Sequence, residues 1–204
     1  ACAAPGTVRR VPVQELREDD EIRGLNLDGI YYPANDMQSF DLDMGLLILM
    51  LPAATSVHSL SLGGNDIGIE GASALAAILN ETKITNLDLE RTQLCGLDED
   101  GWGSTYTVEG ITKLCEGLTG SALTSLNLRK NKLGPEGGAA LAEGLKGNST
   151  LQSLDLYDND IGDKGASALA AILKETQITS LNVCSNNITG DAANHLATVV
   201  LEHA

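Results

Sequence analysis

The nine-residue string GASALAAIL occurs twice in this chain, at 71–79 and again at 165–173. The flanking residues are also alike, since LGGNDIGIE precedes the first copy and LYDNDIGDK precedes the second. A match of this length indicates an internal repeat. Such a repeat constrains the fold strongly, because one short unit cannot bury its own apolar residues and has to stack on its neighbours.

A smaller pattern, L-x-x-L-x-L-x-x-N-x-L, defines the repeating unit. Clear copies begin at positions 57, 84, 123, 151 and 178, and a weaker copy begins at position 22 with Leu25 and Leu27. In the copy that begins at 123, a glycine follows fourteen residues later at Gly137, and leucines follow at Leu141 and Leu145. The alternation in the first half predicts a short strand, and the spacing by four in the second half predicts one face of a helix. The asparagine after the strand has an amide that can satisfy backbone groups in the turn.

These units resemble the long leucine-rich repeats of the ribonuclease-inhibitor type, and also those of Ran GTPase-activating proteins and NOD-like receptors. The resemblance implies an α/β solenoid, a curved horseshoe segment of about six repeats with parallel strands on its concave side and helices on its convex side. It implies little about function, because this fold serves many different partners.

The domain organisation follows from the pattern. We expect one solenoid rather than two globular domains, because 204 residues are filled by repeats of this length. The expected segments are an N-terminal extended arm (1–21), a divergent first repeat (22–56), repeat one (57–83), repeat two (84–122, with an insert at 95–107), repeat three (123–150), repeat four (151–177) and repeat five (178–204).

Composition excludes some partners. The net charge is −15 and the pI is about 4.4, which argues against nucleic acid, because phosphate binding needs clustered Lys and Arg. The acidity fits either a solvated surface or a basic partner. No apolar run reaches the roughly 18 residues of a membrane span, so any membrane association would be peripheral and through a partner.

The four cysteines and the first residue bear on the compartment. The cysteines are scattered, with no C-x-x-C, which favours reduced thiols and an intracellular location; a Cys95–Cys115 bridge is the alternative. The sequence begins at Ala1, as a mature protein would after loss of a targeting peptide. The expected location is therefore cytoplasmic or organellar, in a plastid or mitochondrion.

The stretch GLLILMLPAA at 45–54 departs from the regular pattern. In a helical register its residues Leu47, Ile48 and Leu51 would face outward, which makes the segment apolar on all sides. Such a helix is usually buried all round. Two interpretations stay open: burial under the N-terminal arm, or a docking surface for another protein or a membrane-embedded partner.

The insert in repeat two is acidic and carries the only tryptophan. Its residues from Asp98 to Glu109 have the oxygen spacing of a calcium loop, but Trp102 stands where an oxygen ligand belongs. An acidic surface loop is the preferred interpretation, with Trp102 and Tyr106 as anchors for a partner.

Residues that flank the inward leucines should line the concave side. In the central repeats these positions are charged or aromatic, and in the outer repeats they are small and neutral. We therefore expect partner binding at Glu90, Arg91, Arg129, Lys130, Asp155, Tyr157 and Asp158. The alternative is a solvated face on which the charges pair with one another.

The predicted function is a non-catalytic protein-protein interaction scaffold, an accessory or structural subunit of a larger and possibly organellar assembly. The chain has no recognisable catalytic motif, and we expect no cofactor and no metal. The alternatives are a GTPase-activating-type regulator or a sensing-type repeat fragment. The last strand, 178–183, is expected to be an edge that the C-terminal segment or a partner covers.

Overall fold

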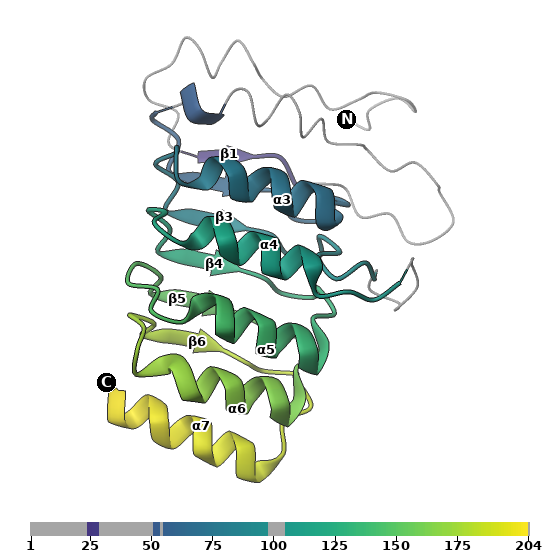
Figure 1. The fold of residues 1–204 in the computed structure, drawn as a ribbon, viewed down its shortest axis with the longest axis vertical. Helices are drawn as coiled ribbons and strands as arrows, with labels where there is room; N and C mark the ends of the chain where they lie inside the picture. Colours follow the sequence, from purple (N-terminus) through teal and green to yellow (C-terminus); the bar gives the residue numbers. More distant parts are fainter. Residues whose placement is uncertain (1–23, 29–50, 54, 98–104, 204) are drawn as a thin grey trace, which may run out of the picture.

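A computed structural model of the chain describes residues 24–28, 51–53, 55–97 and 105–203. Its strands form one parallel sheet in which the spatial order follows the chain order. Figure 1 shows them stacked one above the next along the long axis of the molecule. The strands are β1 (Gly24–Asn26), β2 (Ser59–Ser61), β3 (Asn86–Asp88), β4 (Ser125–Asn127), β5 (Ser153–Asp155) and β6 (Ser180–Asn182).

A helix follows each strand from β2 onward, and these helices cover one face of the sheet (Figure 1). A short 3-10 helix, η1 (Leu51–Ala53), precedes β2. The alternation of parallel strands and helices confirms the predicted α/β solenoid. The α-helices are α3 (Gly68–Leu79), α4 (Glu109–Leu118), α5 (Gly134–Leu145), α6 (Gly162–Leu173) and α7 (Gly190–His203).

The core lies between the sheet and the helices. Leucines of neighbouring strands lie side by side in register, as Leu126 does with Leu154, and both of these side chains are 1% exposed. The helix leucines close the core from the other side; Leu75, Leu141 and Leu169 are completely buried. Apolar burial of this kind is the main stabilising contribution in folding.

A ladder of buried asparagines joins the turns that follow the strands. The Asn131 amide nitrogen donates to Leu89 O at 2.7 Å in the preceding repeat and to Leu128 O at 3.0 Å in its own. The backbone N–H of Asn131 donates to Asn159 Oδ1 at 2.9 Å, so the ladder continues into the next repeat. Thr92 occupies the asparagine position in repeat two. Its backbone N–H and its hydroxyl both donate to Asn131 Oδ1, so the ladder continues through this repeat.

Small residues allow the helices to stack closely. A Cβ on Gly117 would lie 2.4 Å from the Ala76 Cα, and a Cβ on Gly144 would lie 2.4 Å from the Cys115 Cβ. Real side chains do not approach so closely, so α3, α4 and α5 can pack in this way only with glycine at these two positions.

The apolar stretch at 45–54 differs from expectation where the structure describes it. Leu51 is 1% exposed and belongs to the core, so the expectation that it faces outward is wrong. It belongs to the same core cluster as Leu25, Leu27 and Leu60, so the core extends to η1. Leu47, Ile48 and the arm at 1–21 lie outside the described residues. In the part of the chain that is described, no helix has the length and hydropathy needed to cross a bilayer.

Candidate functional site

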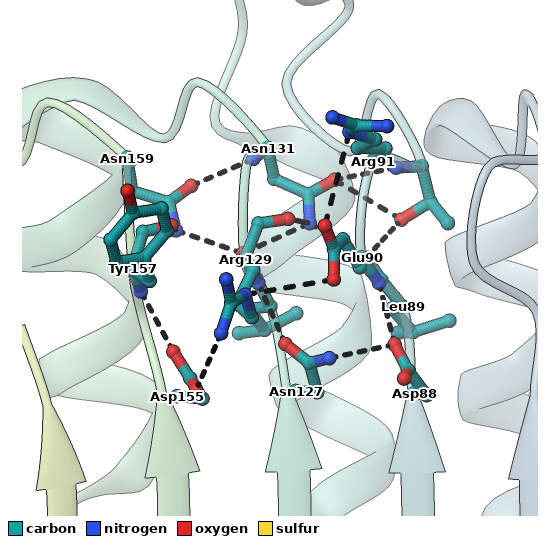
Figure 2. Close-up of polar contacts among 12 residues, drawn as sticks. Asp88, Leu89, Glu90, Arg91, Asn127, Arg129, Asn131, Asp155, Tyr157 and Asn159 are labelled. Atoms are coloured by element: carbon teal, nitrogen blue, oxygen red, sulfur yellow. Dashed lines mark hydrogen bonds and ion pairs between the residues drawn. The ribbon is translucent and has the colours of Figure 1, made fainter. Parts of the chain in front are cut away.

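The residues expected on the concave side follow β3, β4 and β5, where each strand passes into its turn. Figure 2 shows Glu90, Arg91, Arg129, Asp155 and Tyr157 there. In every inner repeat the leucines before and after this point are buried, so the alternate side chains project away from the core. The three strands β3, β4 and β5 thus bring Glu90, Arg129 and Tyr157 into one row. We call this row and its neighbours Arg91, Lys130, Asp155 and Asp158 the strand-face site.

Arg129 is the centre of the strand-face site. Its Nε lies 3.6 Å from Glu90 Oε2 and its Nη1 lies 3.6 Å from Asp155 Oδ2. Its guanidinium carbon lies 4.5 Å from the centre of the Tyr157 ring, a cation–π geometry. Figure 2 shows the guanidinium between the two carboxylates, so one side chain ties together three strands. Glu90 also lies 3.9 Å from the Arg91 Nε.

A second row of polar side chains underlies this network. Asp88, Asn127 and Asp155 occupy the last position of their strands, and each accepts a hydrogen bond from the backbone N–H two residues on, at 2.9, 3.0 and 2.9 Å. The Asn127 amide also donates to Asp88 Oδ1 at 2.9 Å, and the Asn182 amide donates to Asp155 Oδ1 at 3.0 Å. Asp155 is therefore occupied on both carboxylate oxygens and supports the surface. In the sequence, this row corresponds to an alternation of Asp and Asn at the last strand position of repeats two to five, which is the pattern that could have indicated it.

The turns present the remaining residues in an uncommon backbone conformation. Residues one before and one after the ladder position have left-handed φ values of 50–57° in repeats two to five. These residues are Arg91, Gln93, Lys130, Lys132, Asp158, Asp160, Ser185 and Asn187. The left-handed backbone turns their side chains out of the strand direction, along the edge of the sheet.

The charges of these turns are not all paired. Lys132 Nζ lies 3.4 Å from Asp160 Oδ2. Among the described residues, the side chains of Lys130 and Asp158 make no ion pair or hydrogen bond with another side chain. The site thus contains a self-paired centre and two adjacent residues of opposite charge that are available to a partner.

The insert of repeat two is held at its C-terminal end by Tyr106. The tyrosine hydroxyl donates to Leu133 O and accepts from the Gly137 N–H at 3.0 Å, and the ring packs against the core. Burial raises the pKa of the Tyr106 hydroxyl. Tyr106 therefore fixes the insert to the start of α5, and it is only partly buried there. Trp102 and most of the Asp98–Glu109 loop lie outside the described residues.

The three cysteines that the structure describes form no disulfide and no metal site. Cys95 and Cys115 are free and buried, so the alternative of a bridge between them is wrong. Burial raises the pKa of both thiols to about 12. Cys184 is exposed on the strand side. No group of three His, Cys, Asp or Glu among the described residues is arranged to hold a metal ion.

Comparisons with known proteins agree with this architecture. A family profile described as Leucine Rich repeat matches residues 53–76, 122–142 and 147–170. The crystal structure of the leucine-rich repeat-containing protein LegL7 from Legionella pneumophila superposes with a TM-score of 0.63 at 21% identity; the match covers 98% of this chain and 60% of LegL7.

A structure of actin-binding site 2 of leiomodin-1 gives a TM-score of 0.47 at 19% identity, covering 94% of this chain and 86% of that chain. No curated protein sequence matches the chain. The three matched segments, the repeating leucines, the asparagine ladder and the LegL7 fold show that the chain contains leucine-rich repeats and folds as an α/β leucine-rich-repeat solenoid.

Proposed function

We propose that the chain is a non-catalytic scaffold that binds a protein partner on the strand-face site of its central repeats. Leucine-rich repeats serve generally as protein-interaction modules, which supports the coarser part of this proposal. The observation that carries the finer part is the Arg129 network, which holds charged side chains of three strands in one arrangement.

The network prepares the surface for binding. Side chains that are already ordered lose less conformational entropy when a partner docks, so more of the interaction energy appears as affinity. Arg and Tyr are also the residue types that contribute most to binding in protein interfaces. The Arg129 side chain is 35% exposed and Tyr157 is partly buried. Both side chains are therefore held in place by their neighbours before a partner binds.

Lys130 and Asp158 give the site its specificity in this proposal. They follow neighbouring strands, which lie about 4.8 Å apart, and they carry opposite charges. A partner that fits would place an acidic group at Lys130 and a basic group close by at Asp158. Opposed charges of this kind fix orientation and exclude wrong partners more than they raise affinity.

The net charge of the strand-face site also favours a partner segment that carries both acidic and basic groups. The residues from Asp88 to Arg91, Asn127 to Lys132 and Asp155 to Asp160 contain five carboxylates and four cations, a sum of −1, whereas the whole chain has a net charge of −15. The acidity therefore lies mostly outside the site. A partner segment of mixed charge suits this surface better than a strongly basic one.

The test exchanges the two available charges. The purified chain, immobilised in a native extract with mild detergent, captures partners that mass spectrometry identifies. We expect the double variant Lys130→Glu/Asp158→Lys to lose the main captured protein. The matched control is Glu143→Lys/Lys146→Glu, which makes the same exchange at two exposed residues on the helix side. Loss of capture in the control but not in the strand-face variant would contradict the proposal.

We also infer that the scaffold belongs to a larger assembly, as an accessory subunit. Support comes from the exposed helix side, where α3 presents Ser73 and Ala77 and α6 presents Ser167 and Ala171, all small and uncharged. Replacement of both alanines by glutamate should release the chain from its native complex, measured as a shift to lower mass in native gel filtration.

A GTPase-activating role finds less support, because the Arg129 guanidinium is held by two carboxylates; a GTPase stimulation assay distinguishes the two functions.

A further inference from the structure

We propose that the acidic group recognised at Lys130 is a phosphate, so that the protein partner of the strand-face site carries a phosphorylated residue. This inference rests on the proposed function and adds the chemical class of the recognised group to it. The phosphate binds over the turns that follow β3 and β4, between the guanidinium of Arg129 and the ammonium of Lys130.

Arg129 is held in place without the use of its hydrogen-bond donors. The nearest carboxylate oxygens, on Glu90 and Asp155, lie 3.6 Å away, which is beyond hydrogen-bond distance. Its Nε is buried and has no hydrogen-bond acceptor among the described residues. The side chain is 35% exposed, so its outer N–H groups can be reached from the strand side. Arg129 is therefore a fixed cation whose donors are available to an oxyanion.

Lys130 occupies a backbone position where glycine is favoured. Its φ is 55°, and the counterpart in repeat one, Gly64, has a φ of 69°. The backbone N–H groups make equivalent bonds to the next repeat, from Gly64 to Glu90 O at 2.8 Å and from Lys130 to Tyr157 O at 3.0 Å. The fold thus accepts glycine there. A lysine that pairs with no described side chain at this unfavourable position is explained by an external ligand.

The turns that follow β3 and β4 are positive in a strongly acidic chain. Residues 88–93 and 127–132 contain four cations and two carboxylates, a sum of +2, whereas the whole chain has a net charge of −15. Glu90 lies 3.9 Å from Arg91 Nε and 3.6 Å from Arg129 Nε, so one carboxylate faces two guanidinium groups (Figure 2). The turn after β5, at 155–160, has three carboxylates and no cation.

A phosphate monoester matches these groups better than a carboxylate does. It carries a charge of about −2 at neutral pH and has three terminal oxygens. A guanidinium can take two of these oxygens in a bidentate contact, which leaves the third for the ammonium of Lys130. A carboxylate has two oxygens and one charge, so it leaves one of the two cations without a partner. The acidic turn at 155–160 then favours a basic residue beside the phosphorylated one.

The first experiment uses phenyl phosphate as the probe and needs no partner. It is titrated into the isotope-labelled whole chain at constant ionic strength, and NMR follows the Arg129 side-chain N–H and the Lys130 amide. We expect saturable shifts of both signals and clearly weaker shifts with acetate. Lys130→Gln should bind phenyl phosphate about tenfold more weakly, because one charge-assisted contact is lost. Glutamine is compatible with this backbone, since Gln93 has a φ of 55°.

The matched control is Lys146→Gln, which removes the same charge from an exposed position on the helix side and should bind like the wild type. Absence of shifts at Arg129 and Lys130 overturns the proposal. Equal affinity for acetate and phenyl phosphate, or equal binding by the wild type and Lys130→Gln, also overturns it.

The second experiment repeats the capture from native extract after phosphatase treatment, beside extract that receives the same enzyme together with its inhibitor. We expect the main captured protein to be lost only where the phosphatase is active. Capture that survives the phosphatase but is lost in Lys130→Glu/Asp158→Lys overturns the phosphate and leaves the proposed function in place. Capture that this charge exchange does not change overturns the proposed function, and the phenyl phosphate titration then decides on the phosphate site alone.

Discussion

Repeats one and four share almost the same helix but present different strand faces. α3 and α6 have nine identical residues in a row. In both helices the leucines are buried, and Ser73 and Ser167 are exposed at the same position. On the strand side, repeat one has Gly63 and Gly64 where repeat four has Tyr157 and Asp158.

The difference shows which side of the repeat is restricted by packing. The helix side is packed against neighbouring repeats, so its residues are limited to those that fit. The strand side is restricted only where a neighbour uses it: Gly63 N–H donates to Asp28 Oδ1 at 2.8 Å, and a Cβ at Gly63 would lie 3.3 Å from that oxygen. Elsewhere on the strand side, side chains can change without a change in fold, within the limit that the left-handed turn positions set.

The largest expected effect comes from the shared ladder. Asn159→Ala removes bonds to Leu128 O and to the Asn131 N–H, at 2.8 and 2.9 Å, and leaves the buried Asn131 N–H without an acceptor. We expect a loss of about 3 kcal/mol in the free energy of unfolding. Asn65→Ala should cost about half as much, because the Asn65 amide donates to Leu27 O and Leu62 O but, among the described residues, its side-chain oxygen accepts no bond from a backbone N–H. Urea denaturation measures both, and equal losses would show that the ladder acts only locally.

The next effect tests the packing of the helix side. Gly117→Ala places a methyl group 2.4 Å from the Ala76 Cα of α3 and should destabilise the protein by about 2 kcal/mol. Gly190→Ala is the control, since nothing lies within 4 Å of its added Cβ. Thermal denaturation compares the two. A neutral Gly117→Ala would mean that α3 and α4 can separate without cost.

A smaller effect, confined to alkaline pH, distinguishes the buried cysteines from the exposed one. The native pKa of Cys115 is about 12 against an ordinary value of 9.0, so the folded state holds this proton more tightly than the unfolded state. Its contribution to stability is complete below pH 9 and is lost as the pH rises toward 12. We expect the urea midpoint to fall above pH 9 in the wild type and to fall less steeply in Cys115→Ala. Cys184→Ala should keep the wild-type profile, and a profile as flat as that of Cys115→Ala would contradict this assignment.

The smallest effect on stability belongs to the strand face. Arg129→Ala should change the free energy of unfolding by less than about 1 kcal/mol, because its ion pairs are about one-third exposed and screened by solvent. The same variant should reduce partner capture in the assay described above. A loss of stability as large as that of Asn159→Ala would show that the network is structural, and the proposed binding role would lose its support.

Much of the fold could be predicted because the leucine spacing is determined by local geometry. Alternate leucines such as Leu154 and Leu156 can be buried together only in a strand, and leucines four apart such as Leu141 and Leu145 only on a helix face. The asparagine at the turn was predictable because its amide satisfies groups within its own repeat. Its bonds to both neighbouring repeats follow from stacking, which the pattern also implies.

The contacts that could not be predicted from the sequence are those between distant residues. Leu51 is buried in the core cluster that includes Leu25 and Leu60, and a helical register for its segment alone did not indicate this burial. Tyr106 finds its hydrogen-bond partners 27 and 31 residues away at the start of α5, and nothing in the insert indicates that docking. The pairing of Arg129 with both Glu90 and Asp155 likewise depends on the register between strands.

The left-handed turns limit how this surface can diversify. At the eight positions with φ of 50–57°, the chain uses Arg, Gln, Lys, Asp, Ser and Asn and no β-branched residue. Val, Ile and Thr are strongly disfavoured in that conformation. Recognition can therefore evolve by exchange of charge, length and hydrogen-bonding groups, while substitution by branched aliphatic residues would strain every turn it entered. A combinatorial library aimed at new ligands for this scaffold should leave those residue types out.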